Sequence, residues 1–339
     1  MNRKGKKRTL IPILSMVLVV MMLFSGCKGK TQIILTTPLG DNELFRIGDE
    51  VCTVAEAKVF LTTTQNQYET LIQPDMWDKD FGGMSLEDYV KESILAQLTQ
   101  IKSMALMAEE RKVTLDDAET KAIGAAAKEY YESLSAEELN YLGITMEQVE
   151  NLYTQYALSE KLYEEVTADV DTEVSDDEAR SITVQQIYIP KTNTDAKAQA
   201  QEAYEKVTAE NADFEAIALT YDADGDIEAA YRKGAAEAAL ETVVFSLDIN
   251  QISDVVEGES GYYIVKCISS FNREETDANK AEIISQRKTE AFDVVYQEFI
   301  KQQPSQFNDE VWEKLELQSD GSVSTANFFD VYNQFMDVE

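Results

Sequence analysis

The chain has 339 residues and carries 63 acidic against 30 basic side chains, which gives a formal net charge of −33. A chain this acidic does not bind nucleic acid, because binding to phosphates requires Lys and Arg to neutralise them. The sequence also contains no histidine. The usual general base and the usual zinc ligand are therefore missing, which excludes metal catalysis and Ser-His chemistry, and we expect no metal and no cofactor.

Residues 1–26 have the pattern of a signal peptide. A cluster of Lys and Arg comes first, a nearly uninterrupted apolar run extends from Leu10 to Phe24, and small residues precede Cys27. The apolar run is short for a membrane-spanning helix, which needs roughly 20 residues. An uncleaved N-terminal anchor with an incidental cysteine is the alternative. Both interpretations place the rest of the chain outside the cytoplasm.

The string LFSGC, which ends at Cys27, resembles a bacterial lipobox, although Phe24 stands where that motif usually has leucine. The resemblance implies a lipid on Cys27 and a location on the outer face of the bacterial cytoplasmic membrane. Without residues 1–26 the chain has 25 basic and 63 acidic residues, a net charge of about −38. Anionic lipid heads should repel it, so the lipid rather than charge must hold it at the membrane. The alternative interpretation of the acidity is solubility.

Residues 27–44 are predicted to be a tether, and residues 45–174 a helical domain. A short strand or turn is expected at 45–51, followed by a helix from Thr53 that ends before Pro74. Capping residues predict four further helix starts, at Ser85, Thr114, Ser135 and Thr145. Methionines and tyrosines on these helices fit either an adaptable peptide groove or an ordinary core, and at helical spacing the core interpretation is favoured.

Residues 175–271 are predicted to form an α+β domain. A short capped helix is expected at Ser175, and residues 182–190 alternate as a strand. The remaining expected elements are helices at 195–210, 213–221 and 238–247, a loop at 223–234, and strands at 252–258 and 260–271.

Residues 272–339 are predicted to continue as a long helix from Thr276 to Gln302 and then a weaker helical tail. The tail carries aromatic residues that need to be buried, and the N-terminal helices are the obvious partner. The fold class is therefore α+β, with a mainly helical domain built from both ends of the chain and an inserted α+β domain.

Residues 180–271 resemble the parvulin domain of peptidyl-prolyl isomerases (PPIases). The resemblance lies in four strings that occur in order: VQQIYI, NADFEAIALTYDAD, LETVVFSL and INQISDVVEGESGYYIVKCIS. The whole layout, with its helical domain that opens on FRIGDEVCTVAEA, resembles PrsA-type and SurA-type foldases more loosely.

The parvulin resemblance also implies the positions of an isomerase site. The first-strand histidine of the family falls on Gln186, the acidic loop position on Asp222, the phenylalanine that packs on proline on Leu240, and the last-strand histidine on Tyr263. Gln186 and Tyr263 can still hydrogen-bond to each other, as the family's histidines do. Leu240 offers no aromatic face, and Ala236 falls near the methionine of the family's cup. We therefore expect a parvulin fold with weak or absent isomerase activity.

Asp222, Asp224 and Asp226 alternate around Gly225, which resembles part of a calcium loop. The loop lacks the glutamate at its twelfth position, so a metal site is disfavoured.

The leading functional hypothesis is a membrane-tethered extracytoplasmic foldase that assists exported proteins, with unfolded or partly folded exported chains as its partners. The alternative is a non-catalytic holdase or a dedicated assembly factor. A solute-binding or structural lipoprotein is disfavoured, because no two-lobed α/β pattern appears. The resemblance leaves open a homodimer formed through the helical domain.

Overall fold

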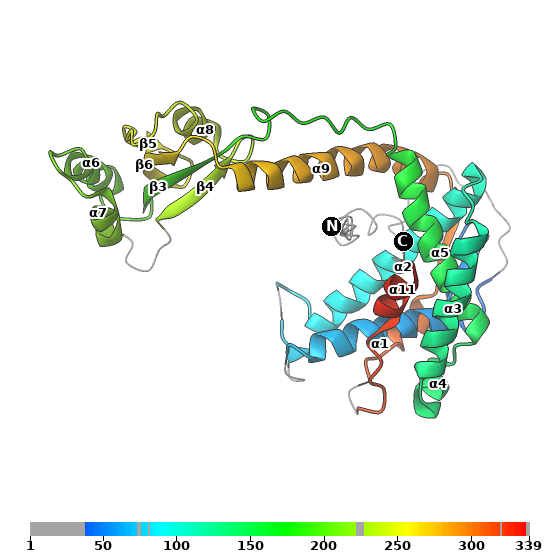
Figure 1. Ribbon diagram of the computed structural model, residues 1–339. Helices are drawn as coiled ribbons and strands as arrows, with labels where there is room; N and C mark the ends of the chain where they lie inside the picture. Colours follow the sequence, from blue (N-terminus) through cyan, green and yellow to red (C-terminus); the bar gives the residue numbers. More distant parts are fainter. Residues whose placement is uncertain (1–37, 73–75, 81, 222–226, 319–320, 337–339) are drawn as a thin grey trace, which may run out of the picture. The chain divides into compact units, whose positions relative to one another are not determined.

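The structure is a computed structural model that describes residues 38–72, 76–80, 82–221, 227–318 and 321–336. The predicted signal peptide at 1–26, the lipidation site at Cys27 and the loop aspartates Asp222, Asp224 and Asp226 lie outside the described residues. The chain divides into two compact units, which Figure 1 colours along the sequence. The helical unit comprises Met1–Ala168 with Phe292–Glu339, and the insert unit comprises Asp169–Ala291.

Five helices follow one another in the first part of the helical unit: α1 (Val54–Glu69), α2 (Leu86–Arg111), α3 (Asp117–Ser133), α4 (Ala136–Leu142) and α5 (Met146–Val166). Each begins at a residue whose side chain accepts a hydrogen bond from a backbone N–H of the first turn. The predicted start at Thr114 is wrong, because Asp116 is the N-cap and forms a capping box with Glu119.

A small antiparallel sheet joins the beginning and the end of the helical unit. β1 (Glu43–Ile47) and β2 (Glu50–Thr53) form a hairpin, and β7 (Ser305–Phe307) pairs with the other edge of β1. The expected helical tail is thus wrong at β7. This strand has three residues, too few to show the alternation of a strand in the sequence, and it forms because it pairs with β1. Among the described residues after it, α10 (Asp309–Glu313) and α11 (Phe328–Met336) are the helical segments.

The aromatic residues of the C-terminal segment pack on the N-terminal helices, as the sequence predicts. The Phe328 ring lies 5.3 Å from Phe60, 5.1 Å from Tyr130 and 4.5 Å from Tyr153, measured between ring centroids. The Tyr153 hydroxyl donates to the Phe328 carbonyl at 2.7 Å. The fully buried Met107 also belongs to this core.

The insert unit is built on a four-stranded antiparallel sheet in the order β4-β3-β6-β5. Its strands are β3 (Ser181–Pro190), β4 (Glu228–Arg232), β5 (Val256–Glu257) and β6 (Gly261–Ser269), and its short helices are α6 (Ala196–Val207), α7 (Phe214–Tyr221) and α8 (Ala238–Val244). α9 (Arg273–Ile300) begins in this unit and ends in the helical unit, and its first residue is Arg273 rather than the predicted Thr276.

Each face of this sheet has its own core. Ile187 and Ile189 pack with α6 and α7, whereas Ile182 and Val184 pack with α8. The alternation predicted for residues 182–190 is therefore confirmed, because successive side chains of a strand point to opposite faces.

Three predictions for the insert unit are wrong. The segment predicted as a loop contains β4, an edge strand whose Ala229 and Tyr231 pack on the α8 face. The segment after Ser175 forms turns rather than a helix, although the Ser175 hydroxyl does accept the Glu178 N–H as a cap would. The strand expected over 252–258 is regular only at β5.

The fold class is α+β, with a helical unit built from both ends of the chain and an inserted α+β unit. Among the helices that the structure describes, none is both long and apolar enough to cross a membrane.

Candidate functional site

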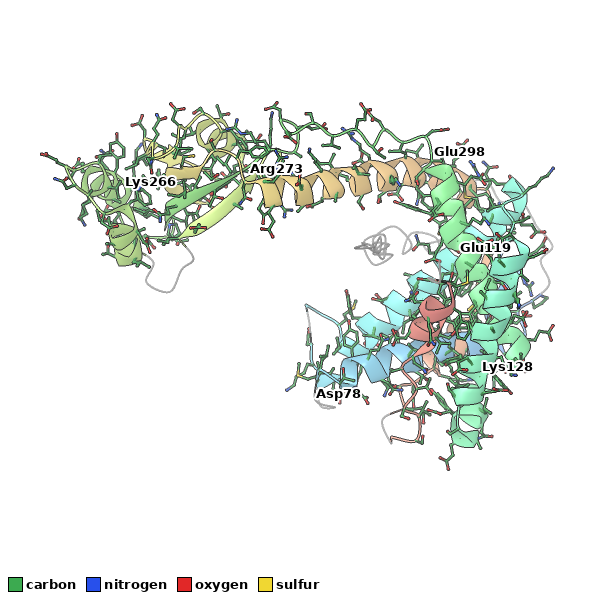
Figure 2. The ribbon with its side chains drawn as sticks, viewed as in Figure 1. Asp78, Glu119, Lys128, Lys266, Arg273 and Glu298 are labelled. Atoms are coloured by element: carbon green, nitrogen blue, oxygen red, sulfur yellow. The ribbon has the colours of Figure 1, made fainter. Side chains whose placement is uncertain are left out.

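Two of the predicted site residues lie on neighbouring strands of the insert unit. Gln186 on β3 is opposite Val265 on β6, and Tyr263 on β6 is opposite Tyr188 on β3. Because residues two apart on a strand share a face, Gln186 and Tyr263 lie on the same face of the sheet, diagonally across the strand pair. Lys266, labelled on β6 in Figure 2, follows Val265 directly and so belongs to the opposite face.

Leu240 lies over the face that carries Gln186 and Tyr263. It is a buried residue of α8 and packs in one cluster with Val184, Val256 and Val265, against which Tyr263 is partly buried. The structure thus brings Gln186, Leu240 and Tyr263 to one face of the sheet. Ala236 is half-buried just before α8, and Asp222 lies outside the described residues.

A tyrosine that the sequence analysis did not select completes this face. Tyr231 of β4 donates its hydroxyl hydrogen bond to Oε1 of Gln186 at 2.6 Å, so the bond expected between Gln186 and Tyr263 is made by Tyr231 instead. Burial, together with the nearby Tyr263 and Glu237, raises the pKa of the Tyr231 hydroxyl to about 12. The hydroxyl therefore stays protonated and remains a donor to Gln186 at neutral pH. Tyr231 was missed because it falls in a segment predicted as a loop.

Tyr263 is held in place by aromatic and backbone neighbours. Its ring lies 4.9 Å from the Tyr188 ring, and the Tyr188 hydroxyl donates to the Ser260 side chain at 3.2 Å. A Cβ atom on Gly258 would lie 2.8 Å from the Tyr263 ring and 2.6 Å from Oε2 of Glu237. A larger residue at position 258 would require these side chains to shift, and this close approach seats the turn between β5 and β6 against the site.

Glu237 fixes the same turn from α8. As the residue before this helix, it accepts the Glu259 N–H on its Oε2 at 2.6 Å. The site face is therefore formed by β3, β4, β6 and the start of α8, with polar groups at Gln186, Tyr231 and Glu237. Within the described residues this face offers no nucleophile activated by a neighbouring base.

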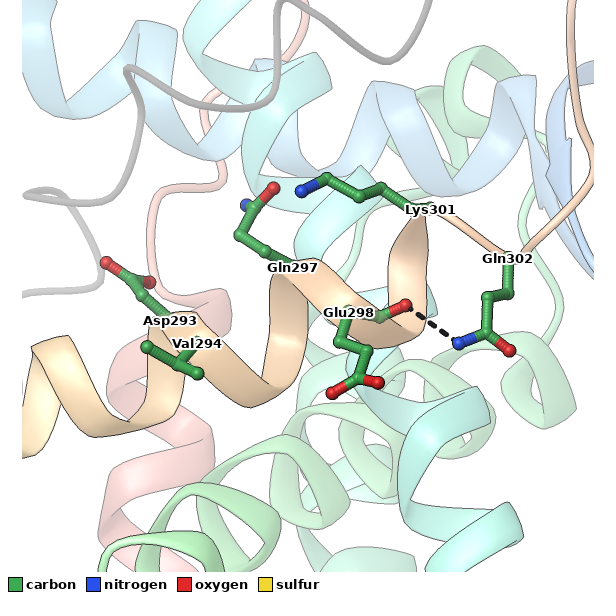
Figure 3. A pocket seen from close by; sticks show the side chains of 6 residues that line it. All are labelled: Asp293, Val294, Gln297, Glu298, Lys301 and Gln302. Atoms are coloured by element: carbon green, nitrogen blue, oxygen red, sulfur yellow. Dashed lines mark hydrogen bonds between the residues drawn. The ribbon is translucent and has the colours of Figure 1, made fainter.

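Among the described residues of the helical unit, two surface hollows lie near the end of α9. The first, about 190 Å³, lies between the end of α2 and α9, and Met107, Arg111 and Phe299 are among its lining residues. The second, about 630 Å³, is lined along α9 and the two residues after it, as Figure 3 shows: Asp293, Val294, Gln297, Glu298, Lys301 and Gln302. Both have charged and amide side chains at their rims.

The described residues contain no cluster of carboxylates and cysteines that could hold a metal ion. Cys52 and Cys267 are both free and buried, one in each unit. Burial raises the pKa of both thiols, so neither is a ready nucleophile.

Comparison with known proteins shows which family the insert unit is similar to. Residues 182–269 match the family profile described as Rotamase, PPIC-type PPIASE domain. The chain is 26% identical over 240 residues to a Foldase protein PrsA of Caldanaerobacter subterraneus subsp. tengcongensis, which covers 65% of this chain and 71% of the relative.

A second relative and a solved structure are also named PrsA. A Foldase protein PrsA of Clostridium acetobutylicum is 26% identical over 273 residues, which covers 69% of this chain and 77% of the relative. The crystal structure of a peptidylprolyl isomerase (PrsA) from Bacillus cereus aligns with a TM-score of 0.37 at 17% identity, over 74% of this chain and 95% of the other. Residues 182–269 thus match a PPIC-type, or parvulin, PPIase domain, and the chain that carries them is similar to PrsA foldases.

Proposed function

We propose that this protein is an extracytoplasmic foldase of the PPIase family whose binding of unfolded exported chains outweighs its catalysis. The observation that carries the proposal is the combination of a PPIC-type domain at 182–269 with a helical unit built from both ends of the same chain. The two relatives that the chain is similar to are named foldases. The helical domain, 45–174 with 272–339, would bind extended segments, and 175–271 would be the PPIase domain.

Weak or absent isomerase activity follows from the residues on the site face. Rotation about a prolyl bond has a barrier of about 18–20 kcal/mol, and a catalyst lowers it by binding the twisted form better than the planar one. Gln186 and Tyr263 stand where the resemblance implies histidines, Leu240 has no aromatic face, and Gln186 is already hydrogen-bonded to Tyr231. The fold can therefore receive a peptide while offering little that favours the twisted amide.

The location is proposed from the N-terminal sequence. A lipid on Cys27 would anchor the chain to the outer face of the membrane, since two acyl chains suffice where one gives only marginal binding. The unsubstituted chain should incorporate radiolabelled palmitate, and the substitution Cys27→Ala should abolish that incorporation. An unsubstituted chain that is membrane-bound yet incorporates no palmitate would favour the uncleaved anchor instead.

An isomerase assay tests the catalytic part of the proposal. With a proline tetrapeptide as substrate, we expect the full chain in a mild detergent to be at least about tenfold slower than an ordinary parvulin, roughly 1.4 kcal/mol less transition-state stabilisation. A rate equal to that of an ordinary parvulin would contradict weak catalysis.

Restoring the family residues tests the position of the site. Gln186→His, Leu240→Phe and Tyr263→His together should raise the isomerase rate if the site lies on this face. The matched control is Gln185→His, on the opposite face of the same strand. No gain from the triple variant, with the fold intact by circular dichroism, would remove the site assignment.

Suppression of aggregation separates a general foldase from a dedicated assembly factor. A general foldase or holdase should suppress the aggregation of several unrelated unfolded proteins at stoichiometric amounts. A factor for one surface partner would suppress one of them or none.

A further inference from the structure

Tyr231 is placed by the register of β4 against β3. It lies opposite Ile182, on the strand face that also carries Gln186. Its hydroxyl donates to Oε1 of Gln186 at 2.6 Å although Gln186 lies four residues further along β3, so the Tyr231 ring and the Gln186 side chain extend toward each other over this face. The ring therefore covers part of the face on which Gln186, Leu240 and Tyr263 meet.

The environment of Tyr231 keeps the ring in that position. The residue is partly buried against the cluster that contains Leu240, and its β4 neighbour on the same face is the small Ala229. Tyr263 and Glu237 both lie close enough to disfavour ionisation of the hydroxyl. The ring thus has a hydrogen bond at its tip, an apolar cluster beside it and no bulky neighbour on β4 to displace it.

We propose that Tyr231 is a specificity-determining residue that occupies the place of a prolyl ring and makes the site discriminate against proline. This inference rests on the proposed function, because it takes Gln186, Leu240 and Tyr263 as the residues of the isomerase site. It adds a steric cause for weak activity that is separate from the replaced histidines. A prolyl ring can reach the site only after the Tyr231 ring has left and its bond to Gln186 has broken.

Two substitutions of Tyr231 separate its bulk from its hydrogen bond. Tyr231→Val keeps a β-branched strand former that is too short to reach Gln186. Tyr231→Phe keeps the ring and loses only the bond. Tyr204→Ala, on α6 and partly buried against the other face of the sheet, is the matched control for the loss of a tyrosine.

The test is calorimetric binding of a proline tetrapeptide, and of the same tetrapeptide with alanine in place of proline, to the full chain in a mild detergent. For Tyr231→Val we expect the Kd for the proline peptide to fall at least about tenfold while the Kd for the alanine peptide stays within twofold. Tyr231→Phe, which loses the bond but keeps the ring, should gain less affinity for the proline peptide than Tyr231→Val, and Tyr204→Ala should bind it within twofold of the unsubstituted chain. A merely structural role would weaken the binding of both peptides together.

Several outcomes would overturn the inference. One is a folded Tyr231→Val variant whose proline-to-alanine selectivity is unchanged, and Tyr231→Ala serves as a second opening variant if the valine form does not fold. Another is a gain with Tyr231→Phe as large as with Tyr231→Val, because the ring would then not be the obstacle. Tyr231→Val should also be added to the variant that carries Gln186→His, Leu240→Phe and Tyr263→His. The fourfold variant should have a higher isomerase rate than the effects of Tyr231→Val and of the triple change predict when they are simply combined. A combined effect that is only additive, or smaller, counts against the inference.

Failure of the proposed function shows itself in a different measurement. Suppression of aggregation by the unsubstituted chain depends on client binding and not on Tyr231. If that suppression is missing while Tyr231→Val gains proline binding, the foldase proposal fails and the inference about Tyr231 stands. If suppression is present and selectivity does not change, only the inference fails.

Discussion

Glu138 shows how a single carboxylate holds the C-terminal segment of the helical unit. It lies in the first turn of α4, and its Oε2 accepts the Ser135 N–H at 2.8 Å in a capping box. Its Oε1 accepts the backbone N–H groups of Ser324 and Thr325 and the Thr325 hydroxyl, at 3.0, 2.9 and 2.7 Å. Burial raises the pKa of Glu138, but these hydrogen bonds outweigh it and lower the pKa to about 2.

The substitution Glu138→Gln should destabilise the helical unit at neutral pH. The amide carries no charge and must turn its NH2 group toward hydrogen-bond donors on one side. We therefore expect the free energy of unfolding to fall by on the order of 3 kcal/mol at pH 7. A carboxylate with a lowered folded-state pKa stabilises above its unfolded pKa, near 4.5, and loses this stabilisation as the pH falls toward about 2. Urea unfolding at several pH values should therefore show the two proteins converging between pH 4.5 and pH 2. A difference that stays constant with pH would show that the charge is not responsible.

At the scale of elements, the long helices were predictable and the short strands were not. The helices of the helical unit can be predicted from the helical spacing of their apolar residues and from N-caps such as Thr53 with Glu56. Both signals involve only residues that are close in sequence. β4 and β7 have no such signal. β4 contains two consecutive alanines, and β7 has three residues, so both exist because a partner strand pairs with them.

The site residues also divide into those that the sequence could predict and those that it could not. The sheet face of Gln186 and Tyr263 could be predicted, because alternation along β3 and β6 is a local property. The side chain that reaches Gln186 could not, because Tyr231 comes from the unpredicted strand and its contact is set by inter-strand register.

A buried ion pair joins α2 to the start of α1. Nζ of Lys102 lies 2.6 Å from Oε1 of Glu56, and their side chains are 1% and 4% exposed. Oε2 of Glu56 also accepts the Thr53 N–H at 2.6 Å, so this one carboxylate caps α1 and binds α2. Burial raises the pKa of the nearby Glu50, and Lys102 opposes that shift.

Replacing Lys102 alone should be far worse than replacing both charges. Lys102→Met leaves Glu56 buried without its cation, beside Glu50, at an expected cost of about 3–5 kcal/mol. Adding Glu56→Gln removes the uncompensated charge and keeps an oxygen for the Thr53 N–H, so the double variant should be more stable than Lys102→Met. Urea unfolding of the four proteins completes the cycle. A double variant less stable than either single variant would show that the unpaired charge of Glu56 is not the cause of the instability.

At the scale of the whole molecule, each unit has a core of its own and α9 is fastened in both. Early in α9, Asn279 donates to the Ala179 carbonyl at 3.0 Å, within the insert unit. Late in α9, Phe292 is fully buried and the Tyr296 hydroxyl is hydrogen-bonded to Ser103 at 2.6 Å, within the helical unit. Each end of the helix therefore depends on a different core. We expect that loss of one core unfolds only the end of α9 that packs on it.

This separation predicts two unfolding transitions in a calorimetric scan of the full chain. Phe328→Ala empties the centre of the aromatic core at an expected cost of about 3–5 kcal/mol, and should lower one transition by on the order of 10 °C. Val184→Ala, in the fully buried α8-side core, should lower the other transition alone. Gln334→Ala, exposed on α11, is the control and should move neither. If either core substitution shifts both transitions equally, the units unfold as one, and the inserted domain would owe its stability to the helical unit rather than to its own two cores.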